Sequence, residues 1–204
     1  QLLPVTQHAY RKNKSCLSAW MDIDSLITKA RDEGKACGMI MSDLTGAFNC
    51  ASKETLLPQL RVAGFELHSL KLLESYLTGR ENSVKIDTYI SRPREVHTGV
   101  AEGSSGGPIC WLCLILCSPE VIKRVEKILA DFEDDRHPAN IPILRVGEHY
   151  RVSECTFADD ENHVVVAKTN ERILQVMDVL QQELTAYFKG LGLKEARAKQ
   201  QHII

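Results

Sequence analysis

Apolar residues recur every three to four positions in several segments of this chain, and this spacing predicts helices. The first predicted helix lies between a capping Ser15 and Gly34, and the longest runs over residues 170–188. Two shorter helices are predicted over 53–62, after a capping Ser52, and over 68–77. The apolar faces expected to enter the core are Leu17, Trp20, Met21, Ile23, Ile27 and Ala30 in the first helix, and Ile173, Leu174, Val176, Met177, Leu180, Leu184 and Tyr187 in the longest.

Short apolar runs and alternating stretches predict strands. Residues 36–44 (ACGMIMSDL) form a short apolar run that ends on a charge, which indicates a buried strand. Residues 152–157 and 164–167 predict two more strands on either side of an Asp-Asp turn. Residues 82–87 and 94–100 alternate apolar and polar positions and predict a β-hairpin.

The segments between these elements have their own patterns. A glycine-rich turn over residues 102–108 leads into one long apolar helix expected from Ile109 onward. Residues 131–151 are polar and contain two prolines, so we expect a variable loop there. The C-terminal residues after 194 are expected to form a basic tail. The order of elements predicts an α+β fold in which an antiparallel sheet is backed by helices on one face.

Composition adds few constraints. The chain has 204 residues, of which 44% are hydrophobic and 25% charged, as in an ordinary globular protein with one sizeable core. Its net charge of −2 argues weakly against a nucleic-acid-binding protein but is compatible with a local basic groove. No apolar run is long enough to span a membrane, so no membrane partner is expected.

Seven cysteines are present, an odd number with no secretory signal before them, and this indicates reduced thiols in an intracellular compartment. Cys110, Cys113 and Cys117 have a spacing that is compatible with metal binding. They also fall at i, i+3 and i+7 of an apolar run, which is one face of a buried helix. Structural zinc usually needs a fourth ligand, so the core interpretation is favoured over a zinc site.

Three aspartates carry the candidate chemistry. Asp43 ends one predicted strand, and Asp159 and Asp160 lie between two others, in the stretch CTFADDENH. The Asp-Asp pair has three interpretations: an exposed hairpin turn, a salt bridge, or a site for divalent metal ions. If adjacent central strands bring the three carboxylates together, they need compensating positive charge. Oxygen ligands of this kind suit two Mg²⁺ or Mn²⁺ ions, which would support phosphoryl transfer.

Six motifs occur in an order that resembles the reverse transcriptase domain of non-LTR retrotransposons and group II introns. QHAYR (7–11) resembles Q-x-G-F-R, SDLTGAFN (42–49) resembles D-L-S-x-A-F-D, and FADD (157–160) matches the Y/F-A-D-D box. LLESYLTGRENSVKI (72–86) is similar to S-Y-L-x-x-R-x-x-x-V. The other two are GVAEGSSGGP (99–108), similar to G-V-P-Q-G-S-x-x-G-P, and GLGLKEAR (190–197), similar to G-L-x-L-N-x-x-K.

This resemblance implies a right-hand polymerase palm with partial fingers. Residues 1–35 would be partial fingers and residues 36–204 the palm, with a fingers-like insertion over roughly 50–98 and the variable loop over roughly 131–151. The upstream fingers strands and a thumb are expected to be absent. The implied function is an RNA-directed DNA polymerase, which adds dNTPs to a primer on an RNA template by two-metal nucleotidyl transfer.

The resemblance also implies roles for individual residues. Asp43, Asp159 and Asp160 would be the catalytic residues that bind the two Mg²⁺ or Mn²⁺ ions. Nucleotide binding would involve the Leu44 backbone carbonyl, Phe48 as a steric gate against the ribose 2′-OH, and Glu102, Gly103, Ser104 and Arg197. Nucleic-acid contacts are expected at Arg11, Arg80 and Lys199.

Several positions depart from the family pattern. Glu102 replaces a usual glutamine and places a carboxylate where a triphosphate would bind, and Arg197 replaces a lysine that could donate a proton. Two hypotheses therefore stay open: a polymerase core that is active within a larger protein, and a domesticated, inactive domain kept as a structural subunit of an assembly. A third, in which a binding domain captures calcium at the acidic turn, is disfavoured because EF-hand spacing is absent.

Overall fold

The centre of the computed structural model is a four-stranded antiparallel sheet in the order β6-β7-β1-β8. The structure describes residues 3–101, 103–116, 118–133, 149–196 and 198–204. The sheet consists of β6 (Tyr150–Phe157), β7 (Asp160–Ala167), β1 (Ala36–Ser42) and β8 (Gln201–Ile203). This arrangement confirms the predicted α+β class with an antiparallel sheet.

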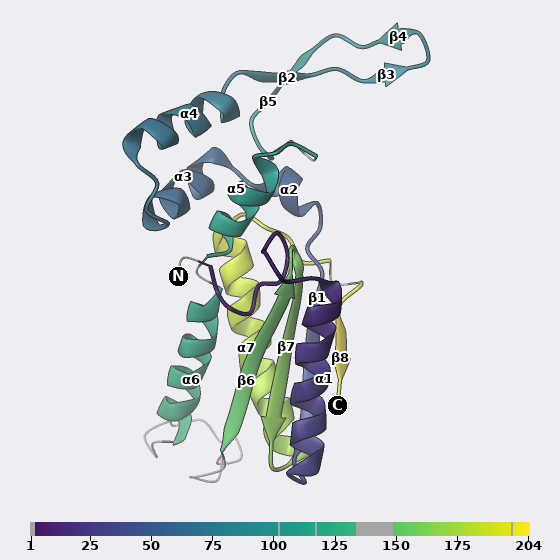
Figure 1. Cartoon of the computed structure of the whole chain (residues 1–204), viewed down its shortest axis with the longest axis vertical. Coiled ribbons are helices and arrows are strands. Elements are labelled where there is room, and N and C mark those ends of the chain that lie inside the picture. Colours follow the sequence, from purple (N-terminus) through teal and green to yellow (C-terminus); the bar gives the residue numbers. More distant parts are fainter. Residues whose placement is uncertain (1–2, 102, 117, 134–148, 197) are drawn as a thin grey trace.

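Helices cover both faces of the sheet, so the prediction that they back a single face is wrong. Side chains alternate between faces along a strand. Met39 of β1 packs in the cluster with Ala19 and Ile23 of α1 (Cys16–Asp32). The neighbouring Gly38 faces α7 (Asn170–Gly190): a Cβ atom there would lie 2.5 Å from Ile173 Cγ2. Figure 1 shows α1 and α7 on opposite sides of the strands.

The apolar face expected for the first helix is largely wrong. Only small or branched residues, Ala19, Ile23 and Ala30, are buried against the sheet, while Leu17, Trp20 and Met21 are exposed. The boundaries are correct, because Ser15 forms a capping box with Ser18 at the start of α1. In α7, Leu174 is also exposed, and the rest of the expected face is buried except Tyr187, which is partly buried.

A second group of helices lies at one end of the sheet (Figure 1). It contains α2 (Ala47–Cys50), α3 (Lys53–Val62), α4 (Leu67–Leu77) and α5 (Gly107–Leu114). Ser52 caps α3 by accepting a hydrogen bond from the Thr55 backbone N–H, as predicted. The short helix α2 has no counterpart among the predicted elements.

The predicted hairpin is present and projects away from the body (Figure 1). Its base pairs β2 (Arg80–Asn82) with β5 (Arg94–Val96), and its tip pairs β3 (Lys85–Ile86) with β4 (Tyr89–Ile90). Residues 80, 81, 89 and 90 are also paired, although they lie outside the predicted stretches 82–87 and 94–100. Residues 85–90, between β2 and β5, form a tight hairpin of their own. Asp87, in the tip turn, has a positive φ of 50°.

The long apolar helix expected from Ile109 is two helices, α5 and α6 (Pro119–Glu133). Pro119 has no N–H group and begins the second helix, as proline favours. Cys110 and Cys113 are buried in the core as predicted, and Cys117 lies outside the described residues. Of the predicted loop over 131–151, residues 131–133 belong to α6 and 150–151 to β6, and 134–148 lie outside the described residues.

The C-terminal segment is a strand and not only a basic tail. Gln201, His202 and Ile203 of β8 pair with Met41, Ile40 and Met39 at the edge of β1.

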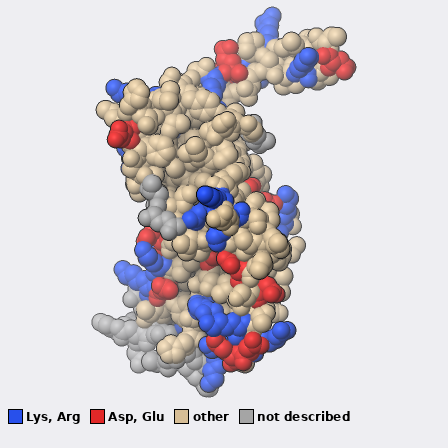
Figure 2. All heavy atoms as spheres, viewed as in Figure 1, with Lys and Arg blue, Asp and Glu red and all other residues tan. Residues whose placement is uncertain are grey.

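Basic and acidic side chains are interspersed over the half of the molecule that contains the sheet, and the helical group between this half and the hairpin has few charges in the view of Figure 2. Within the described residues no helix has the length and hydropathy needed to cross a membrane.

Candidate functional site

The three predicted aspartates come from two neighbouring central strands. Ser42, the last residue of β1, pairs with Glu161 of β7, so Asp43 and Asp160 occupy the next position of the same antiparallel register. Asp159 precedes Asp160 in the turn between β6 and β7. The structure thus brings the end of one strand next to the acidic turn, as the sequence predicted.

The acidic turn has an unusual backbone. Phe157 pairs with Asp160, which leaves Ala158 and Asp159 as a two-residue hairpin loop. Ala158 has a positive φ of 57°, a conformation that costs an L-residue roughly 1–2 kcal/mol. The surrounding structure must therefore hold this residue in place.

Two buried side chains clamp Ala158. The Gln7 Oε1 atom accepts hydrogen bonds from the backbone N–H of Ala158 at 3.1 Å and of Ala9 at 2.9 Å. The Trp111 indole N–H donates to the Ala158 carbonyl oxygen at 2.9 Å, and the Gln7 amide donates to the same oxygen at 3.4 Å. The N–H and the carbonyl of Ala158 are therefore both hydrogen-bonded, by Gln7 of the QHAYR motif and by Trp111 of α5.

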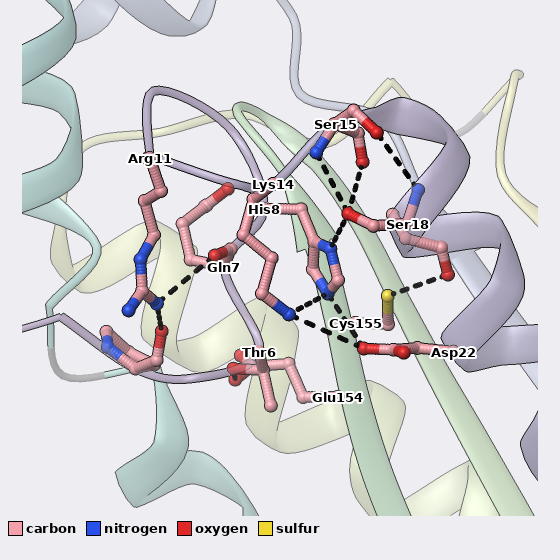
Figure 3. Close-up of polar contacts among 12 residues, drawn as sticks. Thr6, Gln7, His8, Arg11, Lys14, Ser15, Ser18, Asp22, Glu154 and Cys155 are labelled. Carbon is pink, nitrogen blue, oxygen red and sulfur yellow. Dashed lines mark hydrogen bonds and ion pairs between the residues drawn. The ribbon is translucent and has the colours of Figure 1, made fainter.

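The N-terminal loop that carries Gln7 is itself anchored to β6 and α1 (Figure 3). His8 donates its backbone N–H to the Thr156 carbonyl at 2.8 Å, and its ring lies 2.7 Å from Ser18 Oγ and 3.1 Å from Asp22 Oδ2. Burial lowers the pKa of His8, helped by the positive charge of Lys14 and opposed by Asp22. The ring therefore links the N-terminal loop to α1.

We expect Gln7→Ala to destabilise the chain by about 2–4 kcal/mol, because two buried backbone N–H groups lose their acceptor. The free energy of unfolding in urea measures this loss. Gln182→Ala, on the exposed side of α7, is the matched control and is expected to change stability by less than about 0.5 kcal/mol. Equal stabilities of Gln7→Ala and Gln182→Ala would show that the clamp contributes nothing.

A pocket of about 330 Å³ opens beside the aspartates. Asp43, Asp160 and Lys199 contribute charged groups to its lining. The sheet contributes Met41, Asn162 and Gln201, which share one face of three adjacent strands. The remaining lining residues are Ser42, Phe157 and, from α1, Cys16, Ala19, Trp20 and Ile23. The pocket therefore combines an apolar wall with an acidic end.

Lys199 supplies positive charge at this acidic end. Its Nζ lies 2.7 Å from Asp43 Oδ2, and this ion pair raises the pKa of Lys199. Partial burial of the Asp160 carboxyl group raises its pKa, as do the charges of Asp159 and Asp43, whereas Lys199 lowers it. Because the Asp160 side chain as a whole is exposed, solvent screening keeps these effects modest.

The three aspartates influence one another but are not tightly gathered. In the part of the chain that the structure describes, one group of acidic, His or Cys side chains has all its ligand atoms within 4.8 Å, and it is Glu154, Glu161 and His163. In this structure the positive charge beside the carboxylates comes from Lys199, which forms an ion pair with Asp43.

The segment before Lys199 runs beside the end of β1. Thr45 donates its backbone N–H to the Lys194 carbonyl at 2.7 Å, and Ala196 donates to the Asp43 carbonyl at 2.8 Å. Leu44, buried between these bonds, bridges Glu195. The Leu44 carbonyl takes part in neither of these hydrogen bonds. The pairing therefore does not use the carbonyl group that was predicted to contribute to nucleotide binding.

Phe48 lies over the start of α5. Its ring is partly buried, with its centroid 5.4 Å from that of Trp111. Its carbonyl accepts a hydrogen bond from Val100, and at Gly99 a Cβ atom would lie 3.0 Å from Asn49 Cα, so only glycine permits this close approach. The glycine-rich motif and the Phe48 motif are thus packed together.

The other predicted nucleotide-binding residues are placed as follows. Ser104 accepts a hydrogen bond from the Gly107 N–H at the beginning of α5, at 3.1 Å. Gly103 precedes it with a positive φ of 76°. Glu102 and Arg197 lie outside the described residues.

The two predicted nucleic-acid-binding arginines have structural partners. Arg11 donates to the carbonyl oxygens of Pro4 and Gln7 and so helps to shape the N-terminal loop (Figure 3). Arg80 donates to the Gly99 carbonyl at 2.6 Å and lies over the Tyr76 ring. Both therefore hold backbone near the motifs, and contacts with nucleic acid stay a prediction.

Sequence reasoning missed three contributors to this site: the Gln7 clamp, the Trp111 hydrogen bond and the pairing of Lys199 with Asp43. Gln7 was visible as the first letter of the QHAYR motif, and Lys199 as a cation near the C-terminus. Their partners lie more than 100 positions away in the sequence, and no local pattern indicates such contacts.

Comparisons with known proteins show what the chain as a whole is similar to. No protein-family model matches the chain. A probable RNA-directed DNA polymerase from transposon BS of Drosophila melanogaster is 26% identical over 111 residues, which cover 54% of this chain and 12% of that protein. The chain therefore spans about an eighth of the length of this curated relative.

Solved telomerase structures share the fold at low sequence identity. Telomerase from Candida albicans, in complex with a TWJ fragment of telomeric RNA, has a TM-score of 0.54 at 12% identity. Apo telomerase from Candida tropicalis has a TM-score of 0.56 at 10% identity. Both alignments cover 97% of this chain, and they cover 31% and 33% of the respective telomerase chains.

Proposed function

Because this chain resembles reverse transcriptases in its motifs and has a reverse-transcriptase-like fold, we propose that it is the core of an RNA-directed DNA polymerase. Its substrates would be dNTPs and a primer strand paired with an RNA template. The observation that carries the proposal is the convergence of Asp43 with the Asp159–Asp160 turn beside the pocket. Protein partners in a larger complex would contribute further contacts with the nucleic acid.

The proposed division of the chain follows the motifs. Residues 1–35 would act as partial fingers and residues 36–204 as the palm, with the projecting segment within roughly 50–98 as a fingers-like insertion. The small N-terminal part would hold the backbone of the turn that carries Asp159, through the hydrogen bond that Gln7 accepts from Ala158.

Asp43, Asp159 and Asp160 fit a pair of Mg²⁺ or Mn²⁺ ions by their donor chemistry, because hard divalent cations prefer carboxylate oxygens. Partial burial, and after it the negative charges of Asp159 and Asp43, raises the pKa of Asp160, and a bound cation would offset the repulsion between these carboxylates. Such ions, when bound, activate an attacking hydroxyl and stabilise a leaving phosphate. The Leu44 carbonyl would lie beside them.

Lys199 would compete with a cation for Asp43. Its ammonium group already neutralises this carboxylate at 2.7 Å, so metal binding requires Lys199 to leave Asp43. Once released, Lys199 would be free to contact a phosphate of the nucleic acid or nucleotide.

We expect Lys199→Gln to raise the affinity of the chain for Mn²⁺ by about 3- to 10-fold, because a competing charge is removed from a largely exposed pair. Electron paramagnetic resonance of free Mn²⁺ measures this affinity. Lys168→Gln, just beyond the opposite end of β7, is the control and should leave it unchanged. Weaker Mn²⁺ binding by Lys199→Gln would mean that Lys199 supports the metal site.

Phe48 would select the sugar of the nucleotide. Its partly buried ring is held by the Trp111 contact and by the backbone bond to Val100, so it presents a fixed surface. Gly103 and Ser104, with Glu102 and Arg197, would contact the nucleotide nearby. Arg11 and Arg80 would contact the nucleic acid.

We expect Phe48→Ala to raise ribonucleotide incorporation relative to dNTPs by about 10-fold or more, measured by primer extension. Unchanged discrimination would remove Phe48 from the nucleotide site.

The direct test of the proposal is primer extension on an RNA template by the purified chain, and by any larger protein of which it forms a part. We expect incorporation of dNTPs with Mg²⁺ or Mn²⁺ and none after chelation. If neither protein incorporates nucleotides although Mn²⁺ binds, the chain is not a polymerase core.

A further inference from the structure

Three buried titratable side chains gather on the sheet face that α7 covers. Glu154 of β6 pairs directly with His163 of β7, and Glu161 lies two residues before His163, so all three project from the same face. Glu161 and His163 have relative exposures of 0% and Glu154 of 5%. Such groups are rarely buried unless something compensates them.

Most of their polar atoms have no hydrogen-bond partner in the part of the chain that the structure describes. The Thr6 hydroxyl donates to Glu154 Oε2 at 2.8 Å, and Figure 3 shows Thr6 against Glu154. Glu154 Oε1, both carboxylate oxygens of Glu161 and both ring nitrogens of His163 have no hydrogen-bond partner among the described residues. The distance from His163 Nε2 to Glu154 Oε1 is 3.9 Å, too long for a hydrogen bond.

These unpartnered atoms point to a common occupant. One ligand atom from each side chain can be chosen so that all three lie within 4.8 Å of one another. An imidazole with two carboxylates supplies three of the four ligands that a tetrahedral Zn²⁺ ion takes, and a water molecule would supply the fourth. The two negative charges would balance the charge of the ion, which suits the surrounding apolar core.

We propose that Glu154, Glu161 and His163 bind one Zn²⁺ ion inside the sheet–helix core. Ligand distances of about 2.0–2.1 Å in a tetrahedron place ligand atoms roughly 3.3 Å apart. Binding would therefore draw the three side chains slightly closer than they lie here. The ion is acquired during folding, or through the side at which the partly exposed Thr6 covers Glu154.

This site is separate from the proposed polymerase centre and does not depend on it. The pocket beside Asp43 and Asp160 shares the sheet face of Met41 and Asn162, on which α1 lies. The zinc site lies on the other face, because its residues alternate with Asn162 along β7. Zn²⁺ would nevertheless stiffen the acidic turn, since Glu161 directly follows Asp160 in the chain.

The first test is made on the wild-type chain loaded with Zn²⁺ and passed through gel filtration in excess Mg²⁺. We expect one Zn²⁺ per chain, and a thermal midpoint about 5–10 °C above that of the chelated protein. X-ray absorption should show nitrogen and oxygen ligands at about 2.0–2.1 Å and no sulfur at about 2.3 Å. Sulfur ligands, or no retained Zn²⁺, would overturn the proposal, because the chain also has cysteines that can bind zinc.

The second test uses variants. Glu161→Gln and His163→Ala are expected to lose the retained Zn²⁺ and the thermal shift. His97→Ala is the matched control, because His97 lies 3.8 Å from Glu95 in an exposed pair and should not bind the retained ion. Asp159→Asn should also keep its Zn²⁺. Loss of Zn²⁺ from His97→Ala or Asp159→Asn, with retention in His163→Ala, would place the ion elsewhere.

Discussion

Asp159→Asn will reduce nucleotide incorporation by about 10³-fold or more relative to the wild-type sequence, if this chain is a polymerase core. The reason is electrostatic: the substitution removes one of the three carboxylates that would hold divalent cations beside the pocket, while the shape of the side chain is retained. Primer extension on an RNA template, under single-turnover conditions, measures the loss.

The same substitution should not destabilise the fold. Besides burial, the charge of Asp159 helps to raise the pKa of Asp160. When the pKa of a carboxyl group is raised in the folded state, the folded protein becomes less stable as pH rises through that pKa. Asp159→Asn should therefore lower the pKa of Asp160 and leave the chain equally or slightly more stable at neutral pH. Asp24→Asn, on the exposed side of α1, is the activity control. Equal activities of Asp159→Asn and Asp24→Asn would exclude Asp159 from catalysis.

Trp111→Ala will remove about 3–5 kcal/mol of stability, a large part of what a domain of this size has. Trp111 is buried at 1% exposure, contacts the Phe48 ring and donates to the Ala158 carbonyl, so its loss leaves a cavity and an unsatisfied acceptor. Urea unfolding, followed by far-UV circular dichroism, measures the change.

Trp111→Phe separates the two contributions. Phenylalanine keeps most of the packing but cannot donate to Ala158, so we expect a smaller loss of about 1–3 kcal/mol. Trp20, the other tryptophan, is 62% exposed, and Trp20→Phe should stay within about 0.5 kcal/mol of the wild type. If Trp111→Phe is as stable as the wild type, the indole hydrogen bond does not hold the acidic turn.

Local patterns predicted the elements well, because their causes are local. Ser15 and Ser52 cap helices where the sequence places them, and the apolar runs of β1, β6 and β7 form the central sheet. Periodicity predicted burial less well. Leu17, Trp20 and Met21 share helical spacing with Ile23, but α1 packs against the sheet through Ala19, Ile23, Leu26 and Ala30.

Non-local contacts explain most of what the sequence did not predict. Strand β8 is too short to be recognised by its pattern and exists because the edge of β1 pairs with it. One helix was predicted where Pro119 starts a second one. At the site, the convergence of Asp43 with Asp159 and Asp160 followed from strand ends. The buried Glu154–Glu161–His163 group could not be predicted in this way. Its residues alternate along the strands with residues of the opposite sheet face, so the sequence shows only a polar stretch and gives no separate signal for a buried group.

The clamp on Ala158 also has a kinetic consequence. Gln7 and Ala158 are separated by 151 positions, so their hydrogen bonds form only after a very long loop has closed, and loop closure costs entropy before any contact compensates it. The Ala158 N–H gains its hydrogen bond to Gln7 at that moment, not when β6 and β7 first pair. The acidic turn therefore acquires its fixed geometry late in folding, after the sheet, α5 and the N-terminal loop have come together.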